Sequence, residues 1–365
     1  MRVALLTYST KPRGGVVHTL ALAEALAAVG TDVTVVTLGR GGDRAFFRDV
    51  DPRVRQVVVP FPARDDETVG ERILRSIDAL RAGFDPAGFD IVHAQDCISS
   101  NAVDGAIRTV HHLDRFTTPE LVACHDRAIR EPSALVCVSA AVAAEVAAGW
   151  GRNPTVIPNG VDAIAFATAA SDDPAAVAAR AAWRDELGAY VLAVGGIEPR
   201  KGTLDLLTAF ADLPPRERDG LRLVIAGGET LFDYRDYRER FDAEARRRGV
   251  EPVVLGPVPQ ERMAALVAEA RVLGFVSTKE GFGLAAMEAL AAGVPVVARE
   301  LPVLREVFRD AVAYAADVDG MTAALARALH GDGPDPARGR RLAAGYSWAT
   351  AAASHLRLYR ALTSA

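Results

Sequence analysis

Two glutamates, Glu280 and Glu288, flank a glycine-rich turn in the second half of the chain. The short apolar runs 272–276 and 294–298 on either side are typical of central parallel strands that are buried on both faces of a sheet. The segment between them should therefore contain a crossover helix. In its helical part, 285–292, only Glu288 is not apolar, so this carboxylate should lie in a largely buried helix and needs a binding partner.

The turn itself, Gly281-Phe282-Gly283-Leu284, predicts an anion site. Gly281 and Gly283 let the backbone approach a ligand closely, and the free amides of the first helical turn bind phosphate groups. Helical side chains tilt toward the N-terminus of their helix, so Glu288 should lean back toward the same ligand. Amides that hold phosphate, beside carboxylates that hold hydroxyls, predict a site for a sugar nucleotide.

Two cations, Arg200 and Lys201, follow a predicted strand at 190–194 and open the next helix. The arginine offers a planar fork to phosphate oxygens and the lysine a point charge, and each charge-assisted hydrogen bond contributes about 1.5–3 kcal/mol. The pair is therefore a candidate binding site for a diphosphate. A basic helical turn that serves only solubility is the alternative interpretation.

The remaining candidates lie in the first half of the chain. Gly14 and Gly15 precede a helix, where a glycine pair either forms a simple turn or lets a loop cover a phosphate. His93 and His111 each end a predicted strand. Such a histidine is usually structural, but a pair in a cleft could bind an acceptor or a phosphate. The glycine fingerprint of dinucleotide-binding domains is absent, which makes a nicotinamide-dependent oxidoreductase the weakest candidate.

Strands and helices alternate from end to end, which predicts an α/β fold with two doubly wound domains. The strands are expected at 3–7, 33–38, 54–59, 91–94, 106–110, 135–138, 155–157, 190–194, 221–226, 253–255, 272–276, 294–298 and 312–314. The first domain should comprise 1–162 and the second 187–346, with a linker and a helix at 163–186 between them. A last helix, 347–365, should complete the fold.

The composition excludes several classes of function. The 365 residues are half apolar and suffice for two cores, while a formal net charge of −5 provides no basic field for nucleic acid.

The three cysteines, Cys97, Cys124 and Cys137, form no C-x-x-C pair and predict reduced thiols. Because the chain leads directly into its first strand and lacks a stretch of about eighteen apolar residues, we expect a cytoplasmic protein whose membrane association is at most peripheral.

Neither of the two D-x-D segments predicts a metal site. The segment 49–51 precedes a proline and the segment 317–319 precedes a glycine, so turn and cap roles are favoured. Helix amides together with Arg200 and Lys201 can stabilise a diphosphate without a divalent cation. We therefore expect no metal and no other cofactor.

The segment from Glu280 to Glu288 resembles the paired-glutamate motif of retaining GT-B glycosyltransferases in glycosyltransferase family four, also described as glycosyl transferases group 1. The resemblance implies two Rossmann-like doubly wound domains that face each other across a cleft, with the C-terminal helix crossing back to the first domain. It further implies that Glu280 holds hydroxyls of the donor sugar and that Glu288 holds the nucleotide ribose.

The cationic segment resembles a second motif of the same family. Arg200-Lys201-Gly202 matches the segment that stabilises the leaving diphosphate, whereas Gly196 occupies a place where the family commonly has an arginine. Only the second half of that motif is therefore present. Arg200 either replaces the missing guanidinium or faces solvent.

Three segments of the first half also resemble family motifs. Gly14-Gly15 matches the glycine loop that lies over the diphosphate of the donor. The strand end with His93 resembles a D-x-x-H-x-H motif in which Gln95 stands in place of the second histidine. His111 occupies the histidine position of a T-x-H-D turn. The resemblance thus implies donor contacts for the two glycines and makes the histidines catalytic candidates.

The expected function is transfer of a hexosyl group from a nucleotide-diphosphate sugar to a hydroxyl of an unidentified acceptor, with retention of configuration. A UDP- or GDP-sugar is the favoured donor. The catalytic candidates are Glu280, Lys201, Arg200, His111 and His93. Two alternatives are a sugar-nucleotide epimerase of similar fold, which would need no acceptor, and a non-catalytic two-lobed protein that binds sugar nucleotides. Acceptor recognition is expected in loops such as 39–48 and 63–72, and the segment 228–234 could contact the donor.

Overall fold

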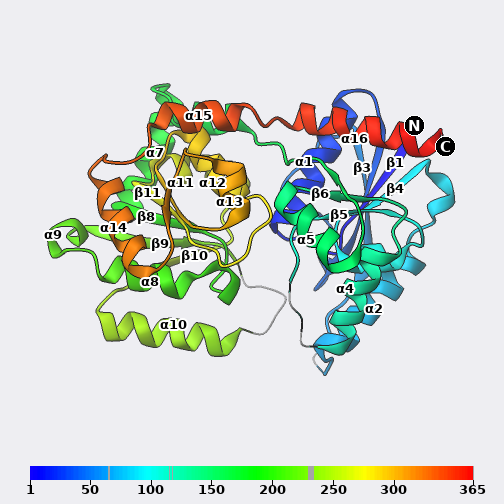
Figure 1. Cartoon of the computed structure of the whole chain (residues 1–365), viewed down its shortest axis with the longest axis horizontal. Coiled ribbons are helices and arrows are strands. Elements are labelled where there is room, and N and C mark those ends of the chain that lie inside the picture. Colours follow the sequence, from blue (N-terminus) through cyan, green and yellow to red (C-terminus); the bar gives the residue numbers. More distant parts are fainter. Residues whose placement is uncertain (65, 115, 117, 229–233, 365) are drawn as a thin grey trace. The chain divides into compact units, whose positions relative to one another are not determined.

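The computed structural model describes residues 1–64, 66–114, 116, 118–228 and 234–364. The chain divides into two compact units, one formed by Met1–Gly160 with Tyr346–Ala365 and the other by Val161–Gly345 (Figure 1). Each unit contains one parallel sheet covered by helices. The predicted fold class, two doubly wound α/β domains, is confirmed.

The first unit is built on a seven-stranded sheet in the order β3-β2-β1-β4-β5-β6-β7, and all its strand pairs are parallel. Its strands are β1 (Arg2–Leu6), β2 (Asp32–Arg40), β3 (Val54–Phe61), β4 (Ile91–Ala94), β5 (Ile107–Val110), β6 (Leu135–Cys137) and β7 (Thr155–Val156). Its helices are α1 (Gly14–Ala28), α2 (Val69–Ala82), η1 (Pro86–Gly88), α3 (Cys97–Ala102), α4 (Pro119–Arg130), α5 (Ala140–Trp150) and α16 (Trp348–Thr363). Val3 pairs with Val33 on one side and with Ile91 on the other, so β1 joins the two halves of the sheet.

The second unit has a six-stranded parallel sheet in the order β10-β9-β8-β11-β12-β13. Its strands are β8 (Ala189–Val194), β9 (Leu221–Ala226), β10 (Val253–Gly256), β11 (Val272–Phe275), β12 (Val296–Arg299) and β13 (Ala313–Ala315). Its helices are α6 (Ala163–Ala169), α7 (Pro174–Leu187), η2 (Pro199–Lys201), α8 (Thr203–Ala211), α9 (Pro215–Arg218), α10 (Arg235–Arg248), α11 (Gln260–Glu269), α12 (Leu284–Ala292), α13 (Pro302–Phe308), α14 (Val318–Leu329) and α15 (Pro336–Ala344). In both units the observed strand bounds differ from the expected ones by at most two residues.

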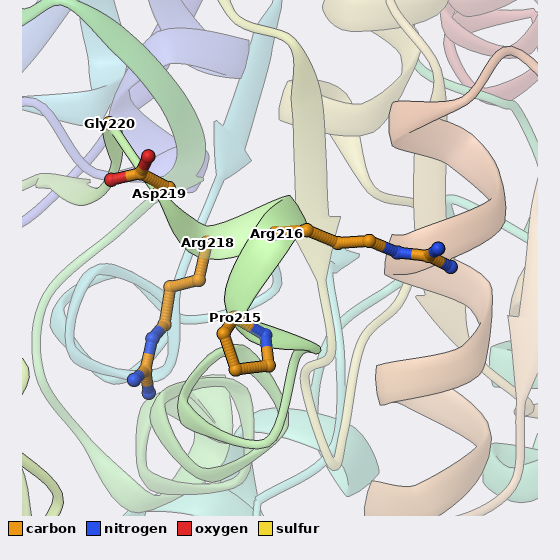
Figure 2. Close-up of a pocket in the computed structure, with 5 residues that line it drawn as sticks. All are labelled: Pro215, Arg216, Arg218, Asp219 and Gly220. Carbon is orange, nitrogen blue, oxygen red and sulfur yellow. The ribbon is translucent and has the colours of Figure 1, made fainter.

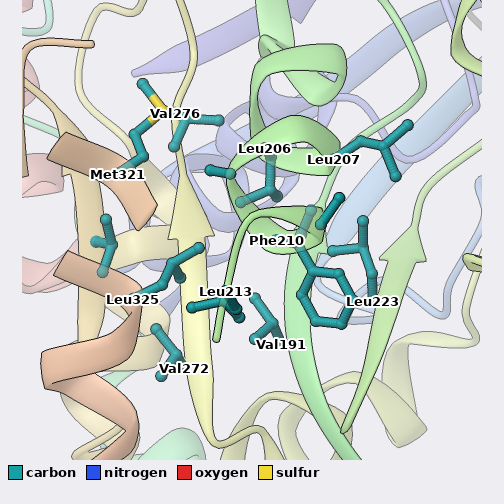
Figure 3. Close-up of a cluster of buried hydrophobic side chains, with 14 of the residues drawn as sticks. Val191, Leu206, Leu207, Phe210, Leu213, Leu223, Val272, Val276, Met321 and Leu325 are labelled. Carbon is teal, nitrogen blue, oxygen red and sulfur yellow. The ribbon is translucent and has the colours of Figure 1, made fainter. Parts of the chain in front are cut away.

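The core of the second unit explains why its strands have apolar sequences without alternation. Figure 3 shows side chains of neighbouring strands packed against those of α8 and α14. The labelled members are Val191, Leu206, Leu207, Phe210, Leu213, Leu223, Val272, Val276, Met321 and Leu325. Full burial of a side chain of this kind contributes about 1.5–3 kcal/mol, so the cluster fixes the sheet firmly between its helices. The loops that leave the strand ends therefore start from rigid positions.

The segment 163–186, in which we expect a linker and a helix, forms two helices. Residues 163–182 form α6 and most of α7, and α6 packs against α11 and α12 of the second unit. Phe166 of α6 and Trp183 of α7 are buried. The alanine-rich composition of this segment favours helix, and these two aromatic side chains supply the apolar contacts that hold both helices.

The C-terminal helix belongs to the first unit. α16 lies against α1 (Figure 1). Its Tyr359 is fully buried. The Tyr359 hydroxyl and His93 Nδ1 are 2.7 Å apart and form a hydrogen bond. This bond connects the end of the chain to β4, across a separation of 266 residues in sequence.

Within the described residues no helix is both long and apolar enough to cross a membrane. The three cysteines are free thiols, as we expected from their spacing. Cys124 and Cys137 are buried, and Cys97 is partly exposed.

We expect Tyr359→Phe to lower the free energy of unfolding of the first unit by about 1–3 kcal/mol, because His93 Nδ1 would lose its partner and stay buried. Chemical denaturation followed by circular dichroism measures this change. Arg360→Gln, at an exposed position of the same helix, is the control. Equal unfolding free energies for wild type and Tyr359→Phe would show that the hydrogen bond contributes nothing to stability.

Candidate active site

The carboxyl edge of the second sheet brings two loops together. β8 lies beside β11, but the next strand after β8 lies on one side of this pair and the next strand after β11 lies on the other. The loops that leave β8 and β11 therefore diverge at a topological switch point, where doubly wound sheets bind their ligands. The first loop carries Arg200 and Lys201, and the second carries Glu280.

Glu280 joins these two loops through ion pairs. Lys201 Nζ lies 2.7 Å from Glu280 Oε1, and Arg200 Nη1 lies 3.3 Å from the same oxygen. Arg200 Nη2 also lies 2.9 Å from Glu198 Oε1. The backbones are joined as well, because the Thr278 amide donates to the Arg200 carbonyl oxygen at 2.8 Å. We call Glu198, Arg200, Lys201 and Glu280 the ion cluster.

The ion cluster keeps Glu280 ionised. Burial alone would raise the pKa of Glu280, but the charges of Lys201 and Arg200 outweigh burial and lower this pKa to about 2. A hydrogen bond from Ser277 acts in the same direction. An ionised carboxylate accepts hydrogen bonds and donates none. Glu280 can therefore orient hydroxyl groups of a sugar, but it does not hold a proton to give away near neutral pH.

The formal charges of the ion cluster cancel, since it contains two acidic and two basic side chains. A diphosphate therefore needs further positive partners, which α12 provides. The residue before α12, Gly283, has no side chain to cap the helix, and the first turn contains no acidic residue. Its free amides and the positive end of the helix dipole favour an anion at this position.

Two glycines of these loops are required by close contacts. Gly202 has φ +63°, and a Cβ there would lie 2.4 Å from the carbonyl oxygen of Val276, just after β11. Gly283 has φ +95°, and a Cβ there would lie 2.5 Å from the ring of Phe308. Neither position admits a side chain without displacing its neighbours, which gives a physical reason for glycine at both.

The other residues predicted for this site lie in the same two loops. Gly281 and Phe282 are buried, and Leu284 is the first residue of α12. Gly196 is partly exposed in the loop between β8 and η2. Arg200 does not simply face solvent, because the ion cluster holds it. The residues 229–233 of the segment that could contact the donor lie outside the described residues.

Glu288 lies in the second turn of α12 and is partly buried. Burial, and to a lesser extent the charge of Asp162, raises the pKa of Glu288 to about 7. Its carboxylate makes no hydrogen bond or ion pair to any described residue. An ionised carboxylate without partners is unfavourable in such surroundings, and a ligand that donates hydroxyl hydrogen bonds would stabilise it.

In the first unit the structure brings His111 next to the N-terminus of α1. Gly14 and Gly15 begin this helix, and a Cβ on Gly15 would lie 3.5 Å from His111 Cδ2. Burial, with smaller effects of His112 and other cations, lowers the pKa of His111 to about 3, so the ring is neutral. Within the described part of the chain, the buried Nε2 of His111 has no hydrogen-bond partner. This nitrogen is available to a ligand.

The contacts of His93 argue against our expectation of a catalytic role. His93 is fully buried, with Nδ1 bonded to Tyr359 and Nε2 2.8 Å from the Thr109 hydroxyl. With both ring nitrogens engaged, His93 connects α16 to the sheet and has no nitrogen left for a substrate. Gln95, after β4, is also buried, and its side-chain amide has no hydrogen-bond partner among the described residues.

Two residues of the site were missed in the sequence. Glu198 pairs with Arg200, and Ser277 bonds to Glu280. Glu198 stands two residues before Arg200, and the rule that a buried ion needs a counter-ion would have pointed to it. Ser277 has no comparable signal, because a serine after a strand is common in loops and turns.

The two D-x-D segments have turn and cap roles. Asp317 caps α14 by accepting a hydrogen bond from the Gly320 amide at 2.8 Å. Asp51 accepts from the Arg53 amide at 2.9 Å and pairs with the guanidinium of the same residue at 2.6 Å. These are the roles that we expected from the neighbouring glycine and proline.

A shallow hollow on the second unit contains none of the predicted residues. It is lined by Pro215, Arg216, Arg218, Asp219 and Gly220 (Figure 2). Arg216 and Arg218 extend in different directions from the short helix α9, and Arg216 pairs with Glu217 at 3.0 Å. Because a single short segment lines this hollow, it does not bring together groups from different elements as an active site does.

Comparison with known proteins identifies the family. The family models Glycosyltransferase Family 4 and Glycosyl transferases group 1 match residues 12–164 and 180–341. The D-inositol 3-phosphate glycosyltransferase of Xylanimonas cellulosilytica is 30% identical over 99% of this chain and 97% of that protein. Sucrose-phosphate synthase from Thermosynechococcus elongatus has a TM-score of 0.77 at 20% identity, with 100% of this chain and 99% of that chain covered. Anabaena HepE in complex with UDP-glucose has a TM-score of 0.74 at 17% identity, with 99% and 100% covered.

The two family models together span most of both units, and the solved structures share the whole fold. The sequence relative extends over nearly the complete chain. The chain therefore belongs to the glycosyltransferases that the models Glycosyltransferase Family 4 and Glycosyl transferases group 1 describe, and it has the GT-B fold.

Proposed function

We propose that this glycosyltransferase moves a hexosyl group from a nucleotide-diphosphate sugar to a hydroxyl acceptor, with retention of configuration and without a metal ion. The observation that carries the proposal is the partly buried ion cluster, which stands at the switch point of the second sheet beside the uncapped N-terminus of α12. UDP- and GDP-sugars are the proposed donors. The HepE structure with UDP-glucose supports a donor of this class.

Each part of the donor has a proposed partner in the second unit. The diphosphate binds the first-turn amides of α12 together with Lys201 and Arg200. The sugar hydroxyls donate to Glu280, whose low pKa keeps it a hydrogen-bond acceptor. The ribose hydroxyls donate to Glu288, which has no protein partner among the described residues. Gly14 and Gly15 remain proposed donor contacts from the family resemblance.

The proposed reaction needs no nucleophile from the protein. The bond between the anomeric carbon and the leaving phosphate oxygen breaks, and negative charge accumulates on the diphosphate. The acceptor hydroxyl attacks the same face of the sugar, and its proton passes to an oxygen of the leaving phosphate. Lys201, Arg200 and the helix amides stabilise the charge as it develops, which lowers the barrier. Glu280 is bound to Lys201 and does not attack the sugar.

His111 is proposed to form one hydrogen bond with the acceptor through its buried Nε2, which has no partner among the described residues.

Nucleic acid is not proposed as a partner, because the net charge of −5 offers no basic field. The cytoplasm is the proposed compartment, on the basis of the three free thiols.

We expect Lys201→Ala to lower kcat by about a hundredfold, equivalent to about 3 kcal/mol, because the leaving diphosphate loses a charge-assisted partner. The measurement is single-turnover transfer with the donor identified by a product screen. Arg222→Ala, at the exposed start of β9, is the control and should retain full activity. Near-wild-type turnover of Lys201→Ala, with the fold confirmed by thermal unfolding, would refute the role of Lys201.

Nucleotide affinity should depend on pH through Glu288. The ionised carboxylate accepts the ribose hydrogen bonds, and the pKa of Glu288 without ligand is about 7. Affinity should therefore be constant well above pH 7 and should fall as pH decreases, by up to roughly tenfold for each unit below pH 7. Calorimetric titration of the nucleoside diphosphate at several pH values measures this dependence. Glu288→Gln should abolish it, and an unchanged pH profile in that variant would exclude Glu288.

Product analysis tests retention and metal independence together. From an α-linked donor we expect an α-linked product, identified by the anomeric coupling in its proton NMR spectrum, with the same rate before and after treatment with EDTA. A β-linked product would contradict the proposed mechanism, and loss of activity in EDTA that added magnesium restores would contradict metal independence. An epimerised sugar nucleotide formed without acceptor would instead support the alternative epimerase.

A further inference from the structure

The carboxyl edge of the first sheet carries a second group of cations. The guanidinium carbon of Arg40 lies 5.2 Å from the centre of the Tyr8 ring, and that of Arg13 lies 5.9 Å from the same centre. Arg40 also lies 5.1 Å from the centre of the Phe61 ring. We call Arg13 and Arg40 the arginine pair.

The arginine pair has no carboxylate partner among the described residues. Arg40 donates to two neutral oxygens, the Tyr8 carbonyl at 2.9 Å and the Ser76 hydroxyl at 2.8 Å. Arg13 Nε is buried and has no hydrogen-bond partner within the described part of the chain. Each guanidinium thus keeps donors that no anionic group of the described residues satisfies.

The acidic side chains nearby are bound to other groups. Asp43 lies 3.0 Å from Lys11 Nζ and also accepts a hydrogen bond from the Thr10 hydroxyl. Asp96 accepts from the Tyr8 amide at 3.1 Å and from the Ser99 amide at 2.8 Å. Neither carboxylate forms an ion pair with Arg13 or Arg40. The positive charges of the arginine pair therefore have no direct counter-ion among the described residues.

The charges of this region repel one another. Burial, with smaller effects of Arg72 and Arg13, lowers the pKa of Arg40 to about 10, although Tyr8 and Asp96 act in the opposite direction. Partly buried cations of like charge are unfavourable without a counter-ion, and an anion that binds both would remove this cost. The geometry of the pair therefore favours an anionic ligand.

The arginine pair stands where the first sheet is expected to bind a ligand. β1 lies beside β4, and the chain leaves these strands toward opposite sides of the sheet, so this is the switch point of the first unit. The Tyr8 amide follows β1 and Asp96 follows β4, and the hydrogen bond between them spans the switch point. Arg40 ends β2 and belongs to the loop 39–48, where we expected acceptor recognition.

We propose that the arginine pair binds a phosphate group of the acceptor, so that the acceptor is a phosphorylated alcohol or sugar. The inference rests on the proposed function, which requires a hydroxyl acceptor. Arginine forks match phosphate oxygens in charge and geometry, and the Tyr8 ring lies within cation–π distance of both guanidinium groups. The same chemistry is offered by a soluble sugar phosphate and by the headgroup of a phospholipid.

The test measures binding to protein saturated with a nucleoside diphosphate, which occupies the donor site. The probes are inorganic phosphate, glucose 6-phosphate, glucose, and phosphatidylcholine vesicles with and without phosphatidylinositol. Calorimetry compares wild type with Arg13→Gln and Arg40→Gln. Arg53→Gln is the control, because Arg53 is an exposed, ion-paired arginine just before β3, at the opposite edge of the sheet. Arg40→Gln could lose affinity by misfolding, because Arg40 also makes structural hydrogen bonds. Arg13→Gln is the safer variant, because the Arg13 side chain makes no hydrogen bond to the described residues.

We expect saturable phosphate binding to wild type and to Arg53→Gln, and a loss of about tenfold to hundredfold in affinity for each variant of the pair. Competition by glucose 6-phosphate but not by glucose would assign a soluble acceptor. Binding to vesicles only when they contain phosphatidylinositol, and loss of that binding in Arg13→Gln, would assign a lipid headgroup.

Three results would overturn the inference. The first is equal phosphate affinity in Arg13→Gln and wild type. The second is phosphate binding that neither glucose 6-phosphate nor the lipid headgroup shares. The third is phosphate binding that occurs only when the nucleoside diphosphate is left out. Normal nucleotide binding without phosphate binding would count against the arginine pair alone. Failure of wild type to bind any nucleoside diphosphate would count against the proposed function itself.

Discussion

The ion pair between Glu280 and Lys201 organises the proposed donor site, because it joins the loops that leave two adjacent strands of the second sheet. A carboxylate at this depth is unfavourable by itself, and its two cationic partners make the ionised form the stable one. Removal of one partner from such a buried pair typically costs about 3–5 kcal/mol. The site is therefore formed before a ligand arrives, and its glycines allow the loops to approach one another.

The same principle of construction serves both units, but with different charge. Each sheet has a switch point where loops from two neighbouring strands meet. In the second unit the charges of the ion cluster cancel, so the anion is left to the amides of α12 and to exchange of partners within the cluster. In the first unit Arg13 and Arg40 lack acidic partners among the described residues. Because of this difference we propose that the second unit binds the sugar and the diphosphate of the donor. The first unit is proposed to bind a phosphorylated acceptor.

Much of the fold could be predicted because buried parallel strands have apolar sequences that glycines and polar residues interrupt. The paired glutamates could be predicted for a similar reason, since Glu288 is the only polar residue of an apolar helix. Within 163–186 the helix was predicted but α6 was not, because alanine and short polar residues occur both in linkers and in helices. Only the positions of Phe166 and Trp183 against neighbouring helices distinguish the two.

Contacts between distant parts of the chain limited the prediction of site residues. His93 ends a strand, as a catalytic histidine could, but its partner Tyr359 lies 266 residues away and is visible only in three dimensions. The same holds for the raised pKa of Glu288, which depends on burial and on Asp162. Sequence spacing therefore placed Arg200, Lys201 and Glu280 in loops that the structure brings together, but it did not predict the pKa of Glu288.

A crystal structure of the protein with bound UDP or GDP would show directly whether the second unit holds the donor as proposed. We expect the diphosphate to lie against the first-turn amides of α12 and within hydrogen-bond distance of Lys201, and both ribose hydroxyls to face Glu288. A nucleotide bound elsewhere, or one whose phosphates contact neither α12 nor Lys201, would contradict the assignment of the donor site.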